Sequence, residues 1–144
     1  MSMDPAFLAR ITAADGIIHP SSDAGLCARV LTEARDLLGV TLPDEYMELL
    51  RLTDGLAVSG LVVYGARPHE LEGMEVPSLV DINLSRRDYR PDLAGLLVLG
   101  EVDDEFLVHR GADGHYAMID RVSLDPFEEA ASLQVLLDAL LEDI

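Results

Sequence analysis

The segment LGVTLPDEYMELLRLTDGL, at Leu38–Leu56, contains the start and stop signals of one short helix. Gly39 takes the left-handed conformation at little cost, so it is the natural end of a preceding helix. Pro43 suits the first position of the next helix, because the N–H that it lacks has no intrahelical partner there. Asp54 and Gly55 form a turn pair. The segment therefore predicts one short, well-delimited helix between the proline and this turn.

The predicted helix has one apolar face. Tyr46, Leu49, Leu50 and Thr53 recur at three- and four-residue spacings and so lie on the same side. A helix of this kind packs by its apolar face against the rest of a domain. We interpret six residues that start, pack or end the helix as structural: Leu42, Pro43, Tyr46, Leu49, Leu50 and Gly55.

Two helical segments precede this one. The first lies around residues 5–13, and a turn-rich stretch separates it from a longer helix that begins near Ser22. Ser21 or Ser22 is the expected cap, since a serine hydroxyl can accept a hydrogen bond from a free N–H of the first turn. The predicted apolar face of the longer helix consists of Leu26, Val30, Leu31, Ala34, Leu37 and Leu38.

The pattern changes from a helical period to a period of two after the short helix. Residues 56–65 predict a hairpin of two short strands around a Ser-Gly turn. Residues 66–78 favour a loop. Residues 78–90 are ambiguous but allow a short helix, which Pro91 would end.

The second half predicts antiparallel strands at residues 96–102, 105–110 and 115–122, because only short turns join them. A final helix is expected with Asp125 as its cap, and Glu128 stands at the position of a capping-box partner. The apolar face of this helix consists of Leu133, Leu136, Leu137, Leu140, Leu141 and Ile144.

These elements predict an α+β fold in which a twisted antiparallel sheet is flanked by N-terminal and C-terminal helices. The length of 144 residues is usual for one domain, so we expect a single domain over residues 1–144.

The composition is strongly acidic. Asp and Glu number 27 against 10 basic residues, all arginine, and the formal net charge is −17. Binding of nucleic acid and of anionic membranes depends on Lys and Arg, so we expect neither. The acidity favours a basic protein partner, although it is also compatible with a role in solubility alone.

The chain has no apolar run long enough to cross a bilayer and no pattern of a signal peptide. A single cysteine, Cys27, excludes an internal disulfide and fits a reducing compartment, so we expect a cytoplasmic protein. We interpret Cys27 as a small buried hydrophobe on a helix.

The sequence contains no motif of catalytic or metal-binding chemistry. His19, His69, His109 and His115 are not spaced as metal ligands, and no phosphate-binding glycine loop or nucleophile motif occurs. The last two histidines lie at facing ends of a predicted hairpin and could approach each other there, but ordinary edge-of-sheet residues are the simpler interpretation. We therefore predict no catalytic residue, no metal and no cofactor.

Three segments together resemble the SUKH superfamily, and its bacterial YrhA-like branch is the nearest match. The first is the opening segment, with its LP pair, acidic and aromatic residues, leucines and final Asp-Gly. The second is LAVSGLVVYG at residues 56–65, which is similar to the first hairpin of that family, and the third is LLVLGEVDDEFLVHR at residues 96–110. Many members carry a tryptophan on the late sheet, and this chain has none.

The resemblance implies a small α+β domain that binds another protein and does not catalyse a reaction. Bacterial members mostly act as immunity proteins that bind and block a cognate toxin, often a nuclease or a deaminase. Eukaryotic relatives are interaction proteins in signalling, so a general interaction or scaffold module is the alternative. The oligomeric state is left open as a monomer or a weak homodimer.

An immunity protein of this charge is expected to cover the basic groove of its toxin with an acidic face. The candidate contacts lie in predicted turns and loops, where side chains are exposed. In order of preference they are Asp103, Asp104 and Glu105, then Asp81, Asp88 and Asp92, and then Glu70, Glu72 and Glu75.

Overall fold

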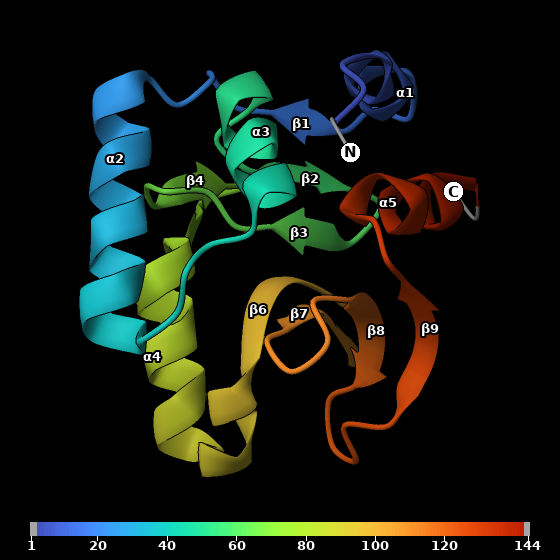
Figure 1. The fold of residues 1–144 in the computed structure, drawn as a ribbon. Helices are drawn as coiled ribbons and strands as arrows, with labels where there is room; N and C mark the ends of the chain where they lie inside the picture. Colours follow the sequence, from blue (N-terminus) through green and yellow to red (C-terminus); the bar gives the residue numbers. More distant parts are fainter. Residues whose placement is uncertain (1–2, 143–144) are drawn as a thin grey trace.

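The computed structural model describes residues 3–142 and has the α+β architecture that the sequence predicts (Figure 1). The helices are α1 (Ala6–Ala13), α2 (Ala24–Glu33), the π-helix η1 (Ala34–Leu38), α3 (Asp44–Leu52), α4 (Leu79–Tyr89), the 3₁₀-helix η2 (Pro91–Gly95) and α5 (Leu133–Glu142). The strands are β1 (Ile17–Ile18), β2 (Leu56–Val58), β3 (Leu61–Val63), β4 (His69–Leu71), β5 (Met74–Val76), β6 (Leu96–Val102), β7 (Glu105–Arg110), β8 (Tyr116–Asp120) and β9 (Pro126–Ala130).

Seven strands form one antiparallel sheet in the order β1-β2-β3-β6-β7-β8-β9. Strands β4 and β5 form a separate hairpin. Figure 1 shows the sheet twisting between its β1–β3 part and its β6–β9 part, with α2 and α4 on one side and α1 and α5 near each other at the other end. The predicted meander of β6, β7 and β8 is confirmed, and the bounds of β6 and β7 agree with the prediction.

The segment Leu38–Leu56 folds as its helix start and stop residues predict, except that its helix begins one residue later than expected. Gly39 has a left-handed φ of 71° and ends the helical run before it. Pro43 has extended backbone and lies just before α3, so it precedes the helix and is not its first residue. Asp44 and Glu45 occupy the first turn, where the N-terminal end of the helix dipole favours negative charge.

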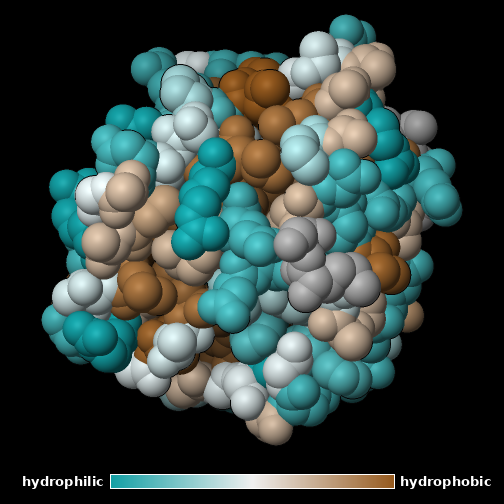
Figure 2. Space-filling view, turned by 45° about the horizontal axis from the view of Figure 1, so that its top comes forward, coloured by the Kyte–Doolittle hydropathy of each residue, from teal (hydrophilic) through white to brown (hydrophobic). Residues whose placement is uncertain are grey.

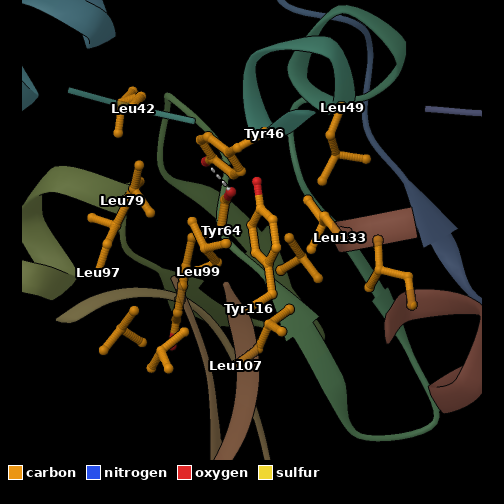
Figure 3. Close-up of a cluster of buried hydrophobic side chains, with 14 of the residues drawn as sticks. Leu42, Tyr46, Leu49, Tyr64, Leu79, Leu97, Leu99, Leu107, Tyr116 and Leu133 are labelled. Carbon is orange, nitrogen blue, oxygen red and sulfur yellow. Dashed lines mark hydrogen bonds between the residues drawn. The ribbon is translucent and has the colours of Figure 1, made fainter. Parts of the chain in front are cut away.

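The apolar face of α3 lies in the centre of the core. Tyr46, Leu49, Leu50 and Thr53 are completely buried, and the Tyr46 hydroxyl donates a hydrogen bond to the backbone oxygen of Tyr64. Figure 3 shows this bond within a cluster of buried side chains that includes leucines of the sheet and of α5. The short helix therefore connects the helical layer directly to the β2–β3 end of the sheet.

The β2–β3 hairpin is confirmed around Ser59 and Gly60. Both residues have positive φ, 46° and 85°, as a two-residue hairpin turn of the I′ type requires. Gly55 also has a positive φ, 87°, and a side chain there would lie 2.7 Å from the Val63 backbone oxygen. Glycine at this position lets the end of α3 lie directly against β3.

The predicted loop at residues 66–78 is wrong, because it contains the β4–β5 hairpin. Glu72 and Gly73 both have positive φ and make its tight turn. Each strand has three residues and none of them is buried, which leaves little hydrophobic periodicity, so the sequence contains only a weak signal for this hairpin.

The predicted start of the last helix is also wrong. Residues Pro126–Ala130 form β9, which pairs with β8, and α5 begins at Leu133. Asp125 and Glu128 therefore do not cap a helix. Leu133, Leu136 and Leu137 are buried and Leu140 and Leu141 are partly buried, whereas Ile144 lies outside the described residues.

A distant carboxylate supports the true start of α5. Glu45 of α3 is buried and accepts hydrogen bonds from the backbone N–H groups of Leu133 and Gln134, at 3.0 Å each, and from the Ser132 hydroxyl. The first N–H groups of a helix have no partner inside the helix, so this contact satisfies them. The true cap comes from a residue almost ninety positions away in the chain, which local patterns do not reveal.

The cap of α2 differs from the prediction as well. Asp23 accepts a hydrogen bond from the Leu26 N–H at 2.7 Å, and neither serine does so. Ser22 is buried, and its hydroxyl donates to Asp54. On the predicted apolar face, Leu31 and Leu37 are exposed. The switch from α2 to the π-helix η1 changes the angular spacing of residues, and this change turns Leu37 outward. Cys27 is buried, as expected.

Candidate functional site

The turn between β6 and β7 concentrates the carboxylates that rank first in the sequence analysis. We call Asp103, Asp104 and Glu105 the acidic turn. Asp103 and Asp104 are exposed and Glu105 is partly exposed. Across residues 3–142, no side-chain hydrogen bond or ion pair joins any of these three carboxylates to the chain. They are therefore available to an external cation.

The acidic turn also contains a like-charge pair across strands. Glu105 on β7 lies directly opposite Asp120 on β8 in the sheet register. Burial raises the pKa of Glu105, and the negative charges of Asp103, Glu128, Asp120 and Asp104 raise it further. Like charges directly opposite each other in an antiparallel pair destabilise the sheet. Asp120 and Glu128 are not among the contacts predicted from sequence, because only strand pairing brings them to the turn.

A hollow lies beside the acidic turn, and we call it the turn hollow. Its volume is about 410 Å³. Asp103 and Glu105 line it together with apolar side chains from three other parts of the fold: β2 and β3, the end of β6, and α5. Its lining residues are Val58, Ser59, Leu61, Val102, Asp103, Glu105 and Leu140.

The third-ranked candidates lie on the β4–β5 hairpin, and the fold brings one of them close to the acidic turn. Glu75 and Asp103 line the same shallow hollow of about 270 Å³, and Gly60 and Arg121 line it as well. Glu72 lines another hollow of about 210 Å³ on the same β2–β3 turn. Glu70 is exposed on β4. Two regions far apart in sequence thus surround the β2–β3 turn with carboxylates.

The second-ranked candidates lie apart from these hollows. Asp81 and Asp88 are exposed on α4, and Asp92 is exposed in η2. Asp92 forms an ion pair with Arg90 at 2.6 Å. The three residues therefore line none of the hollows that surround the β2–β3 turn.

Glu101, in the same acidic run of sequence as the turn, has a structural role. It is buried and accepts hydrogen bonds from the Tyr64 hydroxyl, from Arg86 at 2.7 Å and from Arg121. Both arginines also lie over the ring of Phe106, 5.5 and 5.1 Å from its centroid. The alternation of β6 turns Glu101 inward, so sequence proximity to the acidic turn does not place it in the same environment.

A second polar cluster, centred on Asp54, was not identified from sequence. Its carboxylate is completely buried and accepts hydrogen bonds from Ser22 (2.7 Å), the Ala66 N–H (2.6 Å) and His69 Nε2 (2.7 Å). Burial alone would raise the pKa of Asp54, but these three bonds and the His69 charge outweigh it and lower the pKa. The cluster ties the end of α3 to the segment that enters the β4–β5 hairpin.

The histidines do not form the approach that the sequence left open. His109 pairs in register with Tyr116, and its ring lies 4.9 Å from the tyrosine ring. His115 is exposed. His19 and His69 instead stack, with ring centroids 3.8 Å apart. Burial, followed by the neighbouring His69, lowers the pKa of His19.

The described residues offer neither a metal site nor a membrane-spanning helix. In the part of the chain from residue 3 to residue 142, His, Cys, Asp and Glu side chains nowhere gather in threes with the geometry of a metal site. Within the same range, every helix is too short or too polar to pass through a membrane.

Figure 2 shows a face on which hydrophobic residues form separate patches among hydrophilic ones.

No protein-family model matches the chain, and no curated protein is significantly similar to it.

Proposed function

We propose that this chain is a non-catalytic protein-binding domain that acts as an immunity protein and blocks a basic toxin domain. The acidic turn and the neighbouring carboxylates of the β4–β5 hairpin form the contact surface. The partner presents a basic groove, and the acidic surface covers it. The observation that carries the proposal is the concentration of unpaired carboxylates around the β2–β3 turn.

The distribution of the arginines supports a partner outside the chain. The carboxylates of Asp92, Asp113, Glu129 and Asp138 each form an ion pair with an arginine of the same chain. The acidic turn has no such pair among residues 3–142. Unpaired charges of one sign on exposed turns steer a partner of the opposite sign and raise its rate of association.

The repulsion among the carboxylates around Glu105 supports the same proposal. Glu105 opposite Asp120 is unfavourable for the isolated sheet, and Asp103 and Asp104 add further repulsion. A partner that supplies positive charge converts this repulsion into attraction. The resemblance to the SUKH superfamily points to the same class of function, and membership in that family is part of the proposal.

The test is co-purification of the affinity-tagged chain from its native host, with washes at low and then at high salt. We expect a basic protein with a nuclease or deaminase domain that salt releases, because surface ion pairs weaken as salt screens them. A salt-released partner without a toxin domain would favour the general interaction or scaffold module instead.

Two triple variants with the same change in charge locate the surface. Asp103→Asn with Asp104→Asn and Glu105→Gln should weaken partner binding at least about tenfold and flatten its salt dependence. The control combines Asp36→Asn, Asp81→Asn and Asp88→Asn, which neutralises exposed carboxylates of η1 and α4. Equal losses for the two variants would refute the assignment of the surface to the acidic turn.

A further inference from the structure

The turn hollow combines an apolar lining with two carboxylates. Val58, Leu61, Val102 and Leu140 supply apolar walls, and the carboxylates of Asp103 and Glu105 lie in the same lining. A small neutral apolar ligand would leave the two carboxylates in contact with an uncharged group. A simple metal ion would leave the apolar walls uncovered.

An arginine side chain matches both features. Its three methylene groups pack along apolar surface while its guanidinium remains at the polar end. The planar guanidinium donates five hydrogen bonds in a fork that suits carboxylate oxygens, and it is less strongly hydrated than an ammonium group. A volume of about 410 Å³ leaves ample space for one such side chain.

Among residues 3–142, no arginine lines the turn hollow. Arg121, which lines the neighbouring hollow together with Asp103, forms an ion pair with Glu101. Within residues 3–142, no arginine forms an ion pair with Asp103 or Glu105. The repulsion among the surrounding carboxylates therefore remains unrelieved until a cation arrives from outside.

We infer, on the basis of the function proposed above, that the turn hollow receives one arginine side chain of the basic partner as an anchor of the interface. The aliphatic stem packs on Leu61 and Leu140, and the guanidinium binds Asp103 and Glu105. A buried anchor of this kind, enclosed by weaker contacts, is the usual centre of a protein–protein interface. The carboxylates of Asp104 and of the β4–β5 hairpin, which lie outside the turn hollow, then contribute mainly to the rate of association.

The test uses the capped peptide Ac-Gly-Arg-Gly-NH₂ as a probe, titrated into the ¹⁵N-labelled chain and followed by NMR. We expect weak binding, with a Kd of about 1–10 mM, as befits a single side chain. Chemical-shift changes should centre on the amides of Ser59, Leu61, Val102 and Glu105. The citrulline analogue, Ac-Gly-Cit-Gly-NH₂, has nearly the same shape without the charge and should bind at least about tenfold more weakly.

Two variants and one titration complete the test. Asp103→Asn combined with Glu105→Gln should weaken binding of the arginine peptide at least about tenfold, whereas Asp88→Asn should leave it unchanged. The ¹³C signal of the Glu105 carboxyl should titrate at lower pH when the peptide is bound. Equal binding of the arginine and citrulline peptides, or shift changes centred elsewhere, would overturn the inference.

The outcomes separate this inference from the proposed function. If partner binding requires the acidic turn but the turn hollow does not bind the arginine peptide, the anchor is refuted and the proposed function stands. A turn hollow that binds the peptide in a chain that captures no basic partner supports the anchor chemistry and refutes the proposed function.

Discussion

Glu105 shows how a single residue can weaken the fold at the surface that we propose for binding. It lies opposite Asp120, and its raised pKa reflects burial followed by the charges of Asp103, Glu128 and its other acidic neighbours. Because the fold disfavours the ionised form, ionisation of Glu105 lowers stability as the pH rises through the ordinary range of a glutamate. Glutamine keeps the shape of the side chain and removes the charge.

Glu105→Gln should therefore stabilise the isolated protein at pH 7 by about 0.5 kcal/mol. The gain should shrink below about pH 4, where the wild-type carboxyl also becomes neutral. Urea unfolding at the two pH values measures it, with the exposed Asp88→Asn as a control that should change stability little. A lower stability of Glu105→Gln at pH 7 would contradict the interpretation of the like-charge pair.

At the scale of the elements, Asn83 of α4 takes the place of a neighbouring strand along β6. The pairing of β3 with β6 covers Gly100 and Glu101, and one further backbone hydrogen bond runs from the Tyr64 N–H to the Leu99 oxygen. Further along β6, Asn83 accepts the Val98 N–H through Oδ1 and donates Nδ2–H to the Val98 backbone oxygen, both at 2.8 Å. This buried side chain therefore attaches α4 to the sheet where no strand continues the pairing within residues 3–142.

Asn83→Ala should destabilise the protein by about 3 kcal/mol, because it leaves both backbone groups of Val98 buried without a partner. Denaturant unfolding gives the stability, and native-state hydrogen exchange should show faster exchange of the Val98 amide. The control, Ser85→Ala on an exposed position of the same helix, should cost little. Unchanged exchange at Val98 would show that the asparagine does not hold this part of β6.

At the scale of the whole molecule, the net charge of −17 makes the folded chain repel itself. Salt screens this repulsion, since the Debye length falls from roughly 20 Å at about 20 mM to roughly 4 Å at about 500 mM. We therefore expect the midpoint of thermal unfolding to rise by about 4 °C between these NaCl concentrations. The triple variant of the acidic turn should gain less from salt, and a midpoint that falls with salt would contradict the prediction.

Local patterns predicted the elements whose signals lie within one stretch of chain. The stop at Gly39, the apolar face of α3 and the Ser59-Gly60 turn depend on backbone preference and on spacing within a few residues. The three strands of the meander are long and hydrophobic, so their period was clear. The exposure of Asp103 and Asp104 followed from their position in a two-residue turn.

The predictions failed where a distant residue decides the outcome. Asp125 and Glu128 have the spacing of a capping box, but pairing with β8 draws residues 126–130 into the sheet, and Glu45 caps α5 in their place. The buried Asp54 cluster depends on Ser22 and His69, which lie on opposite sides of α3 in the chain. Contacts at such separations leave no periodic signal in the sequence.

The sequence by itself determined the α+β class, the meander, the acidic character and the exposed turn that carries the candidate site. Each of these depends on residue type or on spacing along the chain, so the physical cause is local. Only the tertiary structure decided which carboxylates are paired with arginine, which lie opposite each other across strands, and which share a hollow with apolar walls. Charge interactions and burial depend on distance in space, and the fold alone sets those distances.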